Sequence, residues 1–168
     1  MLALALCVIA FAPMIGEAVR SAANEGRLRA AGAVEPAGDV YRAMQLAYPA
    51  SFGAMIAEAW LRSATVSAPA IAGAVLFGLA KALKYWAIAT LGPRWTFRVL
   101  VPPRSDRIMS GPYRHLRHPN YLAVVGELTG MALMARATIA GPLAIVLFGT
   151  LMLLRIRVEE RALRLPRG

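Results

Sequence analysis

The feature that most constrains this chain is a series of apolar stretches separated by segments rich in arginine. Three stretches are clear in the sequence: Leu2–Val19, Ala43–Leu61 and Ala68–Leu91. A helix needs about 20 mainly apolar residues to cross the hydrocarbon core of a bilayer. Within that core, only helices and closed barrels satisfy their own backbone hydrogen bonds. We therefore predict that each stretch forms a transmembrane helix.

The composition agrees with a membrane location for most of the chain. Hydrophobic residues make up 58% of the 168 residues and charged residues 17%, with a mean hydropathy of +0.54. Soluble domains contain about 25% charged residues, so the excess apolar side chains are expected to face lipid. The length suits a single domain spanning residues 1–168. No basic segment precedes the first stretch, so we expect a retained helix rather than a signal peptide.

Two polar segments interrupt the apolar pattern. Residues 20–42, rich in alanine, glycine and charge, predict a short interfacial helix followed by a loop. The longest polar stretch runs from Gly92 to His118. Within it, TFRVLVPP and RIMSGPY are expected to pair briefly as extended chain, with Pro102 and Pro103 at the turn.

Two further helices are predicted after this polar stretch. The fourth begins at Pro119, because proline is favoured at the first helical position, and runs to about Met134. The fifth runs from about Ile139 to Leu154 and continues as a polar helix through Arg161. Both apolar parts are shorter than a full span, so we expect a tight hairpin that crosses only part of the bilayer. The predicted fold class is an all-α integral membrane protein with about five transmembrane helices, three of them in residues 1–91.

The net charge of +10 comes from arginines at the ends of the apolar stretches. Fifteen arginines lie on the side that carries the long polar stretch and the C-terminal tail, whereas only Arg62 and Arg136 lie on the other. Cytoplasmic segments of membrane proteins carry such an excess, so we expect the loop and the tail to face the cytoplasm. No nucleic-acid-binding module is recognisable, and Cys7 is the only cysteine. We therefore expect neither nucleic-acid binding nor a metal site.

Side chains that could take part in catalysis or ligand binding concentrate just before the fourth predicted helix. Both histidines of the protein, His115 and His118, lie there in the run GPYRHLRHPNY. A helix N-terminus offers free N–H groups and a positive dipole, so His118 can cap the helix and an anionic group can bind there. The alternative is an interfacial loop, in which arginines contact lipid phosphates and Tyr113 and Tyr121 form an aromatic belt.

The order of the residues is more specific than their types. GPYRHLRHPNY is followed by an apolar hairpin and then by RIRVEERAL. This arrangement resembles the isoprenylcysteine carboxyl methyltransferase family and the related phospholipid methyltransferases, which share an RHPxY element and a distal Glu-Glu pair. Here the two elements are Arg117–Tyr121 and Glu159-Glu160, and the resemblance covers roughly Leu91 to Leu163. It implies a methyltransferase that uses S-adenosylmethionine without a Rossmann domain, and the chain indeed contains no GxGxxG.

The resemblance also implies a role for individual residues. The cofactor pocket would form between the loop, the start of the fourth helix and the end of the fifth. Its cofactor-binding residues would be His118, Tyr121 and Glu159, with the backbone of Gly111, Pro112 and Tyr113 nearby. Beside the acceptor group the family places an arginine and a glutamate, which match Arg155 and Glu160. Anionic and aromatic groups stabilise a cation, and an arginine can hold a carboxylate through two hydrogen bonds.

The acceptor implied by the resemblance is a lipophilic molecule dissolved in the membrane. O-methylation of a carboxyl group of the isoprenylcysteine type, or of a phenolic lipid, fits best. The chain lacks the Gly-x-Gly element of phospholipid methyltransferases and has a short N-terminal half, which disfavours a phospholipid acceptor. Two other classes stay open: a membrane reductase similar to sterol reductases, and a non-catalytic membrane scaffold or transporter.

One acidic residue, Glu127, lies inside the fourth predicted helix. An ionisable side chain at membrane depth is costly, so it is a candidate functional group. The alternative is that Lys81 and Lys84, on one face of the third helix, neutralise it. Gly126 and Gly130 form a GxxxG pattern on the same helix, which indicates close helix packing.

Overall fold

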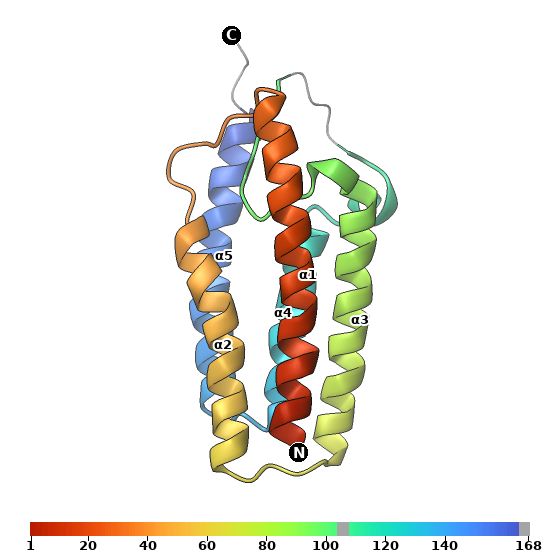
Figure 1. Cartoon of the computed structure of the whole chain (residues 1–168), viewed down its shortest axis with the longest axis vertical. Helices are drawn as coiled ribbons and strands as arrows, with labels where there is room; N and C mark the ends of the chain where they lie inside the picture. Colours follow the sequence, from red (N-terminus) through yellow and green to blue (C-terminus); the bar gives the residue numbers. More distant parts are fainter. Residues whose placement is uncertain (104–107, 165–168) are drawn as a thin grey trace.

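The protein is a bundle of long helices that run side by side (Figure 1). The computed structural model describes residues 1–103 and 108–164, with side chains as far as residue 161. Within these ranges the α-helices are α1 (Leu2–Ala30), α2 (Tyr41–Leu61), α3 (Ala68–Leu91), α4 (Pro119–Ala135) and α5 (Ala140–Arg164). Two short 3₁₀ helices, η1 (Gly92–Arg94) and η2 (Gly111–Arg114), lie between α3 and α4. The prediction of an all-α membrane protein is confirmed.

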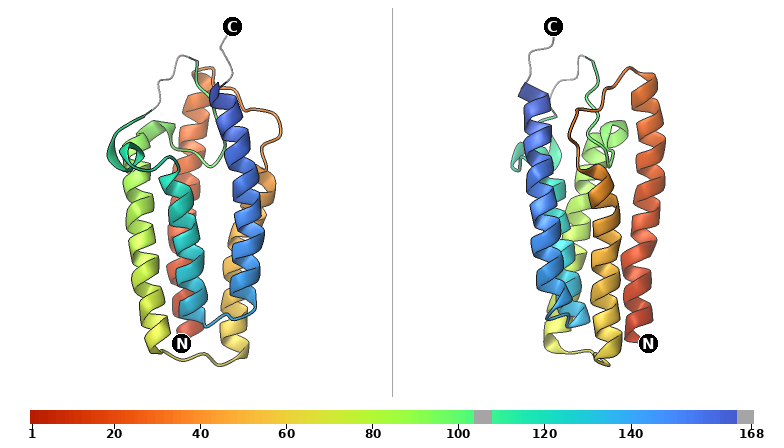
Figure 2. Two further views of the ribbon diagram at one scale, coloured as in Figure 1. Left: turned by 180° about the vertical axis from the view of Figure 1, so that it is seen from behind. Right: turned by 90° about the vertical axis from the view of Figure 1, so that its left-hand side faces the viewer.

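The helices pack in a defined order around a common core. α3 makes its most extensive contacts with α4, and α2 packs mainly against α5 (Figure 2). The loops after α1 and α3 and the end of α5 all meet at one end of the bundle, whereas the short connections after α2 and α4 lie at the other (Figure 1). The predicted grouping of the arginine-rich segments at one end is therefore present in the fold.

Three helices are long and apolar enough to cross a membrane. They are α1, the segment Ala68–Arg94 that contains α3, and the part Ala140–Arg161 of α5. The predicted shortness of the fifth helix was therefore wrong, because the helix continues into its polar end and the 22 residues Ala140–Arg161 are long enough to span. Neither α2, predicted as a clear span, nor the 17-residue α4 meets this criterion of length and hydropathy. Both nevertheless pack along the spanning helices.

Helix α1 is longer than the sequence predicts. We expected its end near Val19 and a separate interfacial helix, but α1 continues without a break to Ala30. The reason is a stripe of buried residues that extends past the apolar stretch, comprising Glu17, Ser21, Asn24 and Leu28. Asn24 Nδ2 donates hydrogen bonds to the carbonyl oxygens of Gly92, at 3.2 Å, and Trp95, at 2.8 Å. These contacts hold the polar end of α1 against the segment that follows α3.

The polar stretch after α3 pairs differently from the prediction. Val101 forms an isolated antiparallel bridge with Val34, which lies in the loop between α1 and α2. The expected partner segment RIMSGPY begins within residues 104–107, which lie outside the described residues. The described part of the chain contains no extended strand, and the bridge joins the two loops at one end of the bundle.

The contact between α3 and α4 depends on glycine. A Cβ atom placed on Gly130 would lie 2.8 Å from both the carbonyl oxygen of Gly73 and the backbone nitrogen of Phe77. A Cβ atom on Gly126 would lie 2.8 Å from the Cβ atom of Ala80. The predicted packing role of the GxxxG pattern is therefore confirmed, because the two backbones approach too closely for a side chain at these positions.

We expect Gly130→Ala to lower the free energy of unfolding by about 1–3 kcal/mol, since the new methyl group would meet backbone atoms that lack freedom to move. Gly78→Ala is the matched control, because a Cβ atom at Gly78 of α3 has no neighbour within 4 Å. Alanine there should leave the stability unchanged or raise it slightly. Thermal unfolding in detergent measures both variants, and equal Tm values for the two would contradict the close contact.

Candidate functional site

The candidate site begins where α4 starts, at the N-cap residue His118. Pro119 is the first helical residue, as predicted, but the His118 side chain makes no capping hydrogen bond. Its ring lies near the end of α5 instead. Nε2 is 3.6 Å from Glu160 Oε1, and Nδ1 is 4.0 Å from Glu159 Oε2. The motif at the start of α4 and the distal glutamate pair are thus neighbours in the fold.

Tyr121 connects this histidine to α5. Its ring centroid is 5.4 Å from that of His118. The Tyr121 hydroxyl donates a hydrogen bond of 2.9 Å to Glu159 Oε2 and accepts one of 3.1 Å from Arg155 Nε. One hydroxyl group therefore joins Glu159 to Arg155. The side chains of Glu159 and Glu160 remain 31% and 36% exposed, so this part of the site is open at the surface.

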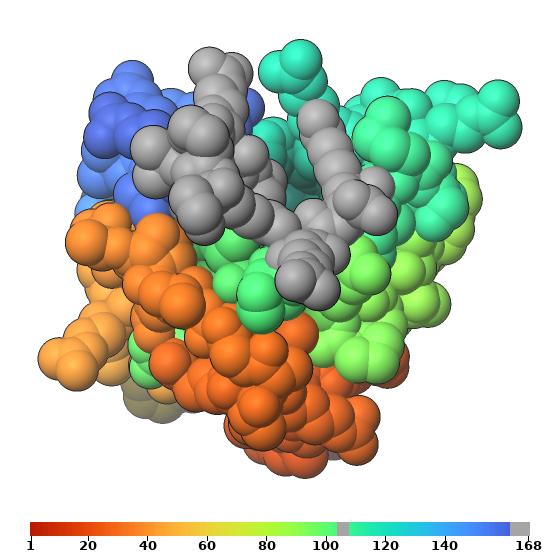
Figure 3. Space-filling model, turned by 90° about the horizontal axis from the view of Figure 1, so that it is seen from above, coloured from red at the N-terminus to blue at the C-terminus, as the bar shows by residue number. Residues whose placement is uncertain are grey.

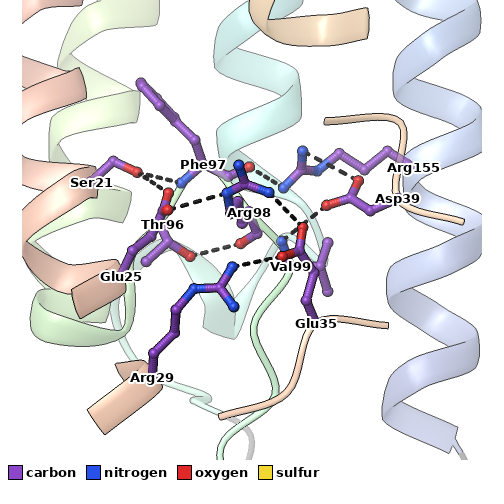
Figure 4. Close-up of polar contacts among 10 residues, drawn as sticks. All are labelled: Ser21, Glu25, Arg29, Glu35, Asp39, Thr96, Phe97, Arg98, Val99 and Arg155. Atoms are coloured by element: carbon purple, nitrogen blue, oxygen red, sulfur yellow. Dashed lines mark hydrogen bonds and ion pairs between the residues drawn. The ribbon is translucent and has the colours of Figure 1, made fainter. Parts of the chain in front are cut away.

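Arg155 lies deeper, with only 6% of its surface exposed. Besides Tyr121, its guanidinium donates a hydrogen bond to the carbonyl oxygen of Phe97, and Nη1 lies 3.6 Å from Asp39 Oδ1 (Figure 4). The other carboxylate oxygen of Asp39 accepts a 3.3 Å hydrogen bond from the backbone N–H of Val99. The sequence placed Asp39 only within the predicted polar segment 20–42, and no spacing linked this residue to α5.

A second polar network fixes the two loops around Arg155. Arg98 Nη1 lies 2.8 Å from Glu35 Oε1, and Arg98 Nε lies 3.2 Å from Glu25 Oε2. Arg29 binds the other oxygen of Glu35 at 2.6 Å (Figure 4). Burial alone would raise the pKa of the Glu35 carboxyl group. The hydrogen bonds from Arg29 and Arg98 outweigh this effect, so the pKa of Glu35 is lowered. The hydrogen bond to Glu35 in turn raises the pKa of Arg98. Both groups are therefore charged at neutral pH, and they hold the loop after η1 against the end of α1.

The predicted Gly111–Tyr113 segment forms η2 and packs against the end of α3. Gly111 has φ +54°, and a Cβ atom there would collide with the Thr90 side chain, so both its backbone and its surroundings favour glycine. Pro112 is buried. Burial, and secondly the negative charge of Glu159, raise the pKa of Tyr113 above its usual range. This tyrosine therefore stays protonated and lies within electrostatic reach of Glu159.

Glu127 belongs to a different cluster, in the interior of the bundle. Lys81 Nζ and Lys84 Nζ each lie 3.3 Å from one of its carboxylate oxygens, and Tyr48 of α2 donates a hydrogen bond to it. Both lysines also bind Glu17 of α1, at 2.8 and 2.7 Å. The predicted ion pairing of Glu127 with Lys81 and Lys84 is present in the fold. Glu17 was missed by the sequence analysis, although an acidic residue within an apolar stretch is itself a signal.

Comparison with protein families identifies the group to which this site belongs. Residues 72–165 match the model of the isoprenylcysteine carboxyl methyltransferase (ICMT) family. The match covers more than half of the chain and includes every residue of the predicted site. The chain belongs to the ICMT family. The family match includes α4 and the glutamate pair, whereas Asp39 lies outside the matched residues.

Two curated relatives of this ICMT-family chain have similar lengths. One is "Uncharacterized protein YpbQ" of Bacillus subtilis (strain 168), 29% identical over 141 residues that cover 84% of each chain. The other is an "Uncharacterized protein" of Haemophilus influenzae (strain ATCC 51907 / DSM 11121 / KW20 / Rd), 26% identical over 141 residues, or 83% of this chain and 82% of the relative. No solved structure matches significantly.

Proposed function

We propose that this protein transfers a methyl group from S-adenosylmethionine to a lipophilic acceptor in the membrane. The observation that supports this most is a chain of two hydrogen bonds, from Arg155 to Tyr121 and from Tyr121 to Glu159. It joins the open glutamate pair to a buried guanidinium. An open polar region suits a soluble donor, and a buried region suits a lipid acceptor. In this proposal the two regions meet at the Tyr121 hydroxyl.

On the donor side, the proposed binding residues are His118, Tyr121 and Glu159, with the backbone of Gly111–Tyr113 nearby. Two partly exposed carboxylates next to two aromatic rings give a negative, π-rich environment. Such an environment fits a sulfonium cation with an attached amino group, because carboxylates and aromatic faces both attract cations. The bound donor supplies an electrophilic methyl group. Glu159 is the residue we assign to its amino group.

On the acceptor side, we assign Arg155 and Glu160. Methyl transfer is an in-line displacement, so holding the acceptor oxygen in position supplies much of the acceleration. The proposed acceptor reaches Arg155 from the lipid phase between helices, and its reacting group is the oxygen of a carboxyl or of a phenolic hydroxyl. Because the arginine-rich end carries the site, we propose that the site faces the cytoplasm and that the chain resides in the cytoplasmic membrane.

Donor binding is the first test of this proposal. We expect the detergent-purified protein to bind S-adenosylmethionine, and expect His118→Ala and Glu159→Ala each to weaken binding by about tenfold or more, since a hydrogen bond to a charged group contributes about 1.5–3 kcal/mol. His115→Ala is the matched control, because His115 lies three residues from His118 and is exposed. It should bind like the native chain. Isothermal titration calorimetry measures all four proteins.

Two results would reject the proposal. Native binding no tighter than that of an adenosine control would remove the methyltransferase assignment. Preferential binding of a reduced nicotinamide nucleotide would instead favour the membrane-reductase alternative.

A further inference from the structure

Each nitrogen of the Arg155 guanidinium already has a partner. Nε binds the Tyr121 hydroxyl, Nη2 binds the carbonyl oxygen of Phe97, and Nη1 faces Asp39 Oδ1 at 3.6 Å and Met44 Sδ at 3.9 Å. The side chains of Arg155 and Asp39 are 7% and 4% exposed. A buried guanidinium next to one carboxylate is electrically balanced. An acceptor carboxylate would therefore have to displace Asp39 or add a second negative charge.

Asp39 has an unused hydrogen-bonding position. Its Oδ2 atom accepts from the Val99 N–H, whereas Oδ1 is buried, accepts no hydrogen bond and lies 3.6 Å from Arg155 Nη1. A buried acceptor atom without a donor is costly, so a ligand that supplies a hydrogen-bond donor there gains affinity. A carboxylate ligand has no proton to donate, whereas a hydroxyl ligand has one.

Asp39 also lines a cavity of about 440 Å³ at the loop end of the bundle, together with Glu35, Tyr41, Arg42 and Arg98. It is formed by the loop between α1 and α2, the start of α2 and the segment after η1, which are visible on this face (Figure 3). Two of its residues are carboxylates. Arg98 is already bound by Glu35 and Glu25, and its guanidinium stacks 4.2 Å from the centre of the Tyr41 ring.

Arg42 is the remaining positive group of the cavity lining. It is exposed, so water screens its attraction for an anion. The charges around Asp39 are therefore less favourable for a carboxylate than for a neutral hydrogen-bond donor.

We infer that the acceptor is a lipophilic molecule with an acidic hydroxyl group, of the phenol or enol class, and that Asp39 accepts its proton. This inference rests on the proposed methyl transfer and selects one of its two acceptor classes. The hydroxyl donates to Asp39, and its oxygen forms the new bond to the methyl carbon as the sulfur–methyl bond breaks. The hydroxyl proton passes to the Asp39 carboxylate, and Arg155 holds that carboxylate in place. A neutral ether and S-adenosylhomocysteine leave, and the proton is later released to water.

Two constitutional isomers test the acceptor class without any variant. Dodecyl para-hydroxybenzoate presents a phenol, and para-dodecyloxybenzoic acid presents a carboxylate on the same ring with the same chain. Equilibrium binding of each isomer to the full-length protein in phosphatidylcholine nanodiscs, corrected with empty nanodiscs, measures the preference. We expect the phenol to bind at least about tenfold more tightly. Equal binding, tighter binding of the acid, or no binding above empty nanodiscs overturns the inference.

Asp39→Asn tests the role of the carboxylate. We expect it to weaken phenol binding and strengthen acid binding, and to reduce transfer from labelled S-adenosylmethionine to the phenol by about a hundredfold or more, as expected for loss of a general base. Glu58→Gln is the control, because it removes a carboxylate at the opposite end, where Glu58 binds the start of α5. It should behave like the native chain. Unchanged transfer in Asp39→Asn overturns the proton-accepting role.

The two proposals fail separately in these experiments. If the protein does not bind S-adenosylmethionine, the methyltransferase proposal is rejected. The preference between the two isomers can still be measured, because that experiment does not require the donor. Loss of the hydroxyl inference appears as preference for the acid in a protein that binds S-adenosylmethionine normally.

Discussion

Replacing Glu127 by glutamine is expected to lower the free energy of unfolding by about 3–5 kcal/mol. Glu127 is fully buried, and its carboxylate lies between Lys81 and Lys84, which also bind Glu17. The four side chains are balanced, two positive and two negative. Glutamine leaves one positive charge uncompensated in the bundle interior, and that charge is costly where water is excluded. The change should lower Tm in detergent by roughly 10 °C.

Two control variants separate charge balance from loss of a single contact. The double variant Glu17→Gln with Lys84→Met removes one charge of each sign, so we expect it to be clearly more stable than Glu127→Gln. Arg20→Gln removes an exposed charge from α1 and should change the free energy of unfolding by less than about 1 kcal/mol. If the balanced double variant is as unstable as Glu127→Gln, the charges are not the reason for the loss.

Helices were predictable wherever hydrophobicity alone determines them. The bounds of α3 agree with the predicted Ala68–Leu91, and α4 begins at the predicted Pro119. The end of α1 was not predictable in this way, because charges interrupt an apolar stretch without ending a helix. The buried positions of Glu17 and Asn24 depend on partners from α3 and the segment after it, and helical periodicity does not reveal such polar contacts.

The candidate site was predictable in part, for a similar reason. The RHPxY element and the glutamate pair are far apart in the sequence, but their joint occurrence predicted that His118, Tyr121 and Glu159 meet, and the structure places these residues together. Their roles stay predictions. Asp39 had no comparable signal, since it lies in a loop without periodicity and outside the family match. Only the fold reveals that it faces Arg155.

Arg155→Ala is expected to abolish methyl transfer while preserving donor binding. Alanine removes the contacts to Phe97 and Asp39, which hold the loops around the proposed acceptor position. Tyr121 keeps its 2.9 Å hydrogen bond to Glu159, so the donor side retains its arrangement. Misplacing a reacting group by about 1 Å can reduce a rate a hundredfold, so we expect at least that loss in transfer, with the dissociation constant of S-adenosylmethionine changed by less than about threefold.

Arg157→Ala is the matched control for this variant, because Arg157 lies two residues further along α5 and is exposed. It should retain both transfer and donor binding. Arg155→Lys should resemble Arg155→Ala, because one ammonium group does not reproduce the planar donors that reach Tyr121, Phe97 and Asp39 from separate nitrogens. Equal losses of transfer and donor binding in Arg155→Ala would contradict an acceptor-side role. The division between an open donor region and a buried acceptor region would then have to be abandoned, because both would depend on the same guanidinium.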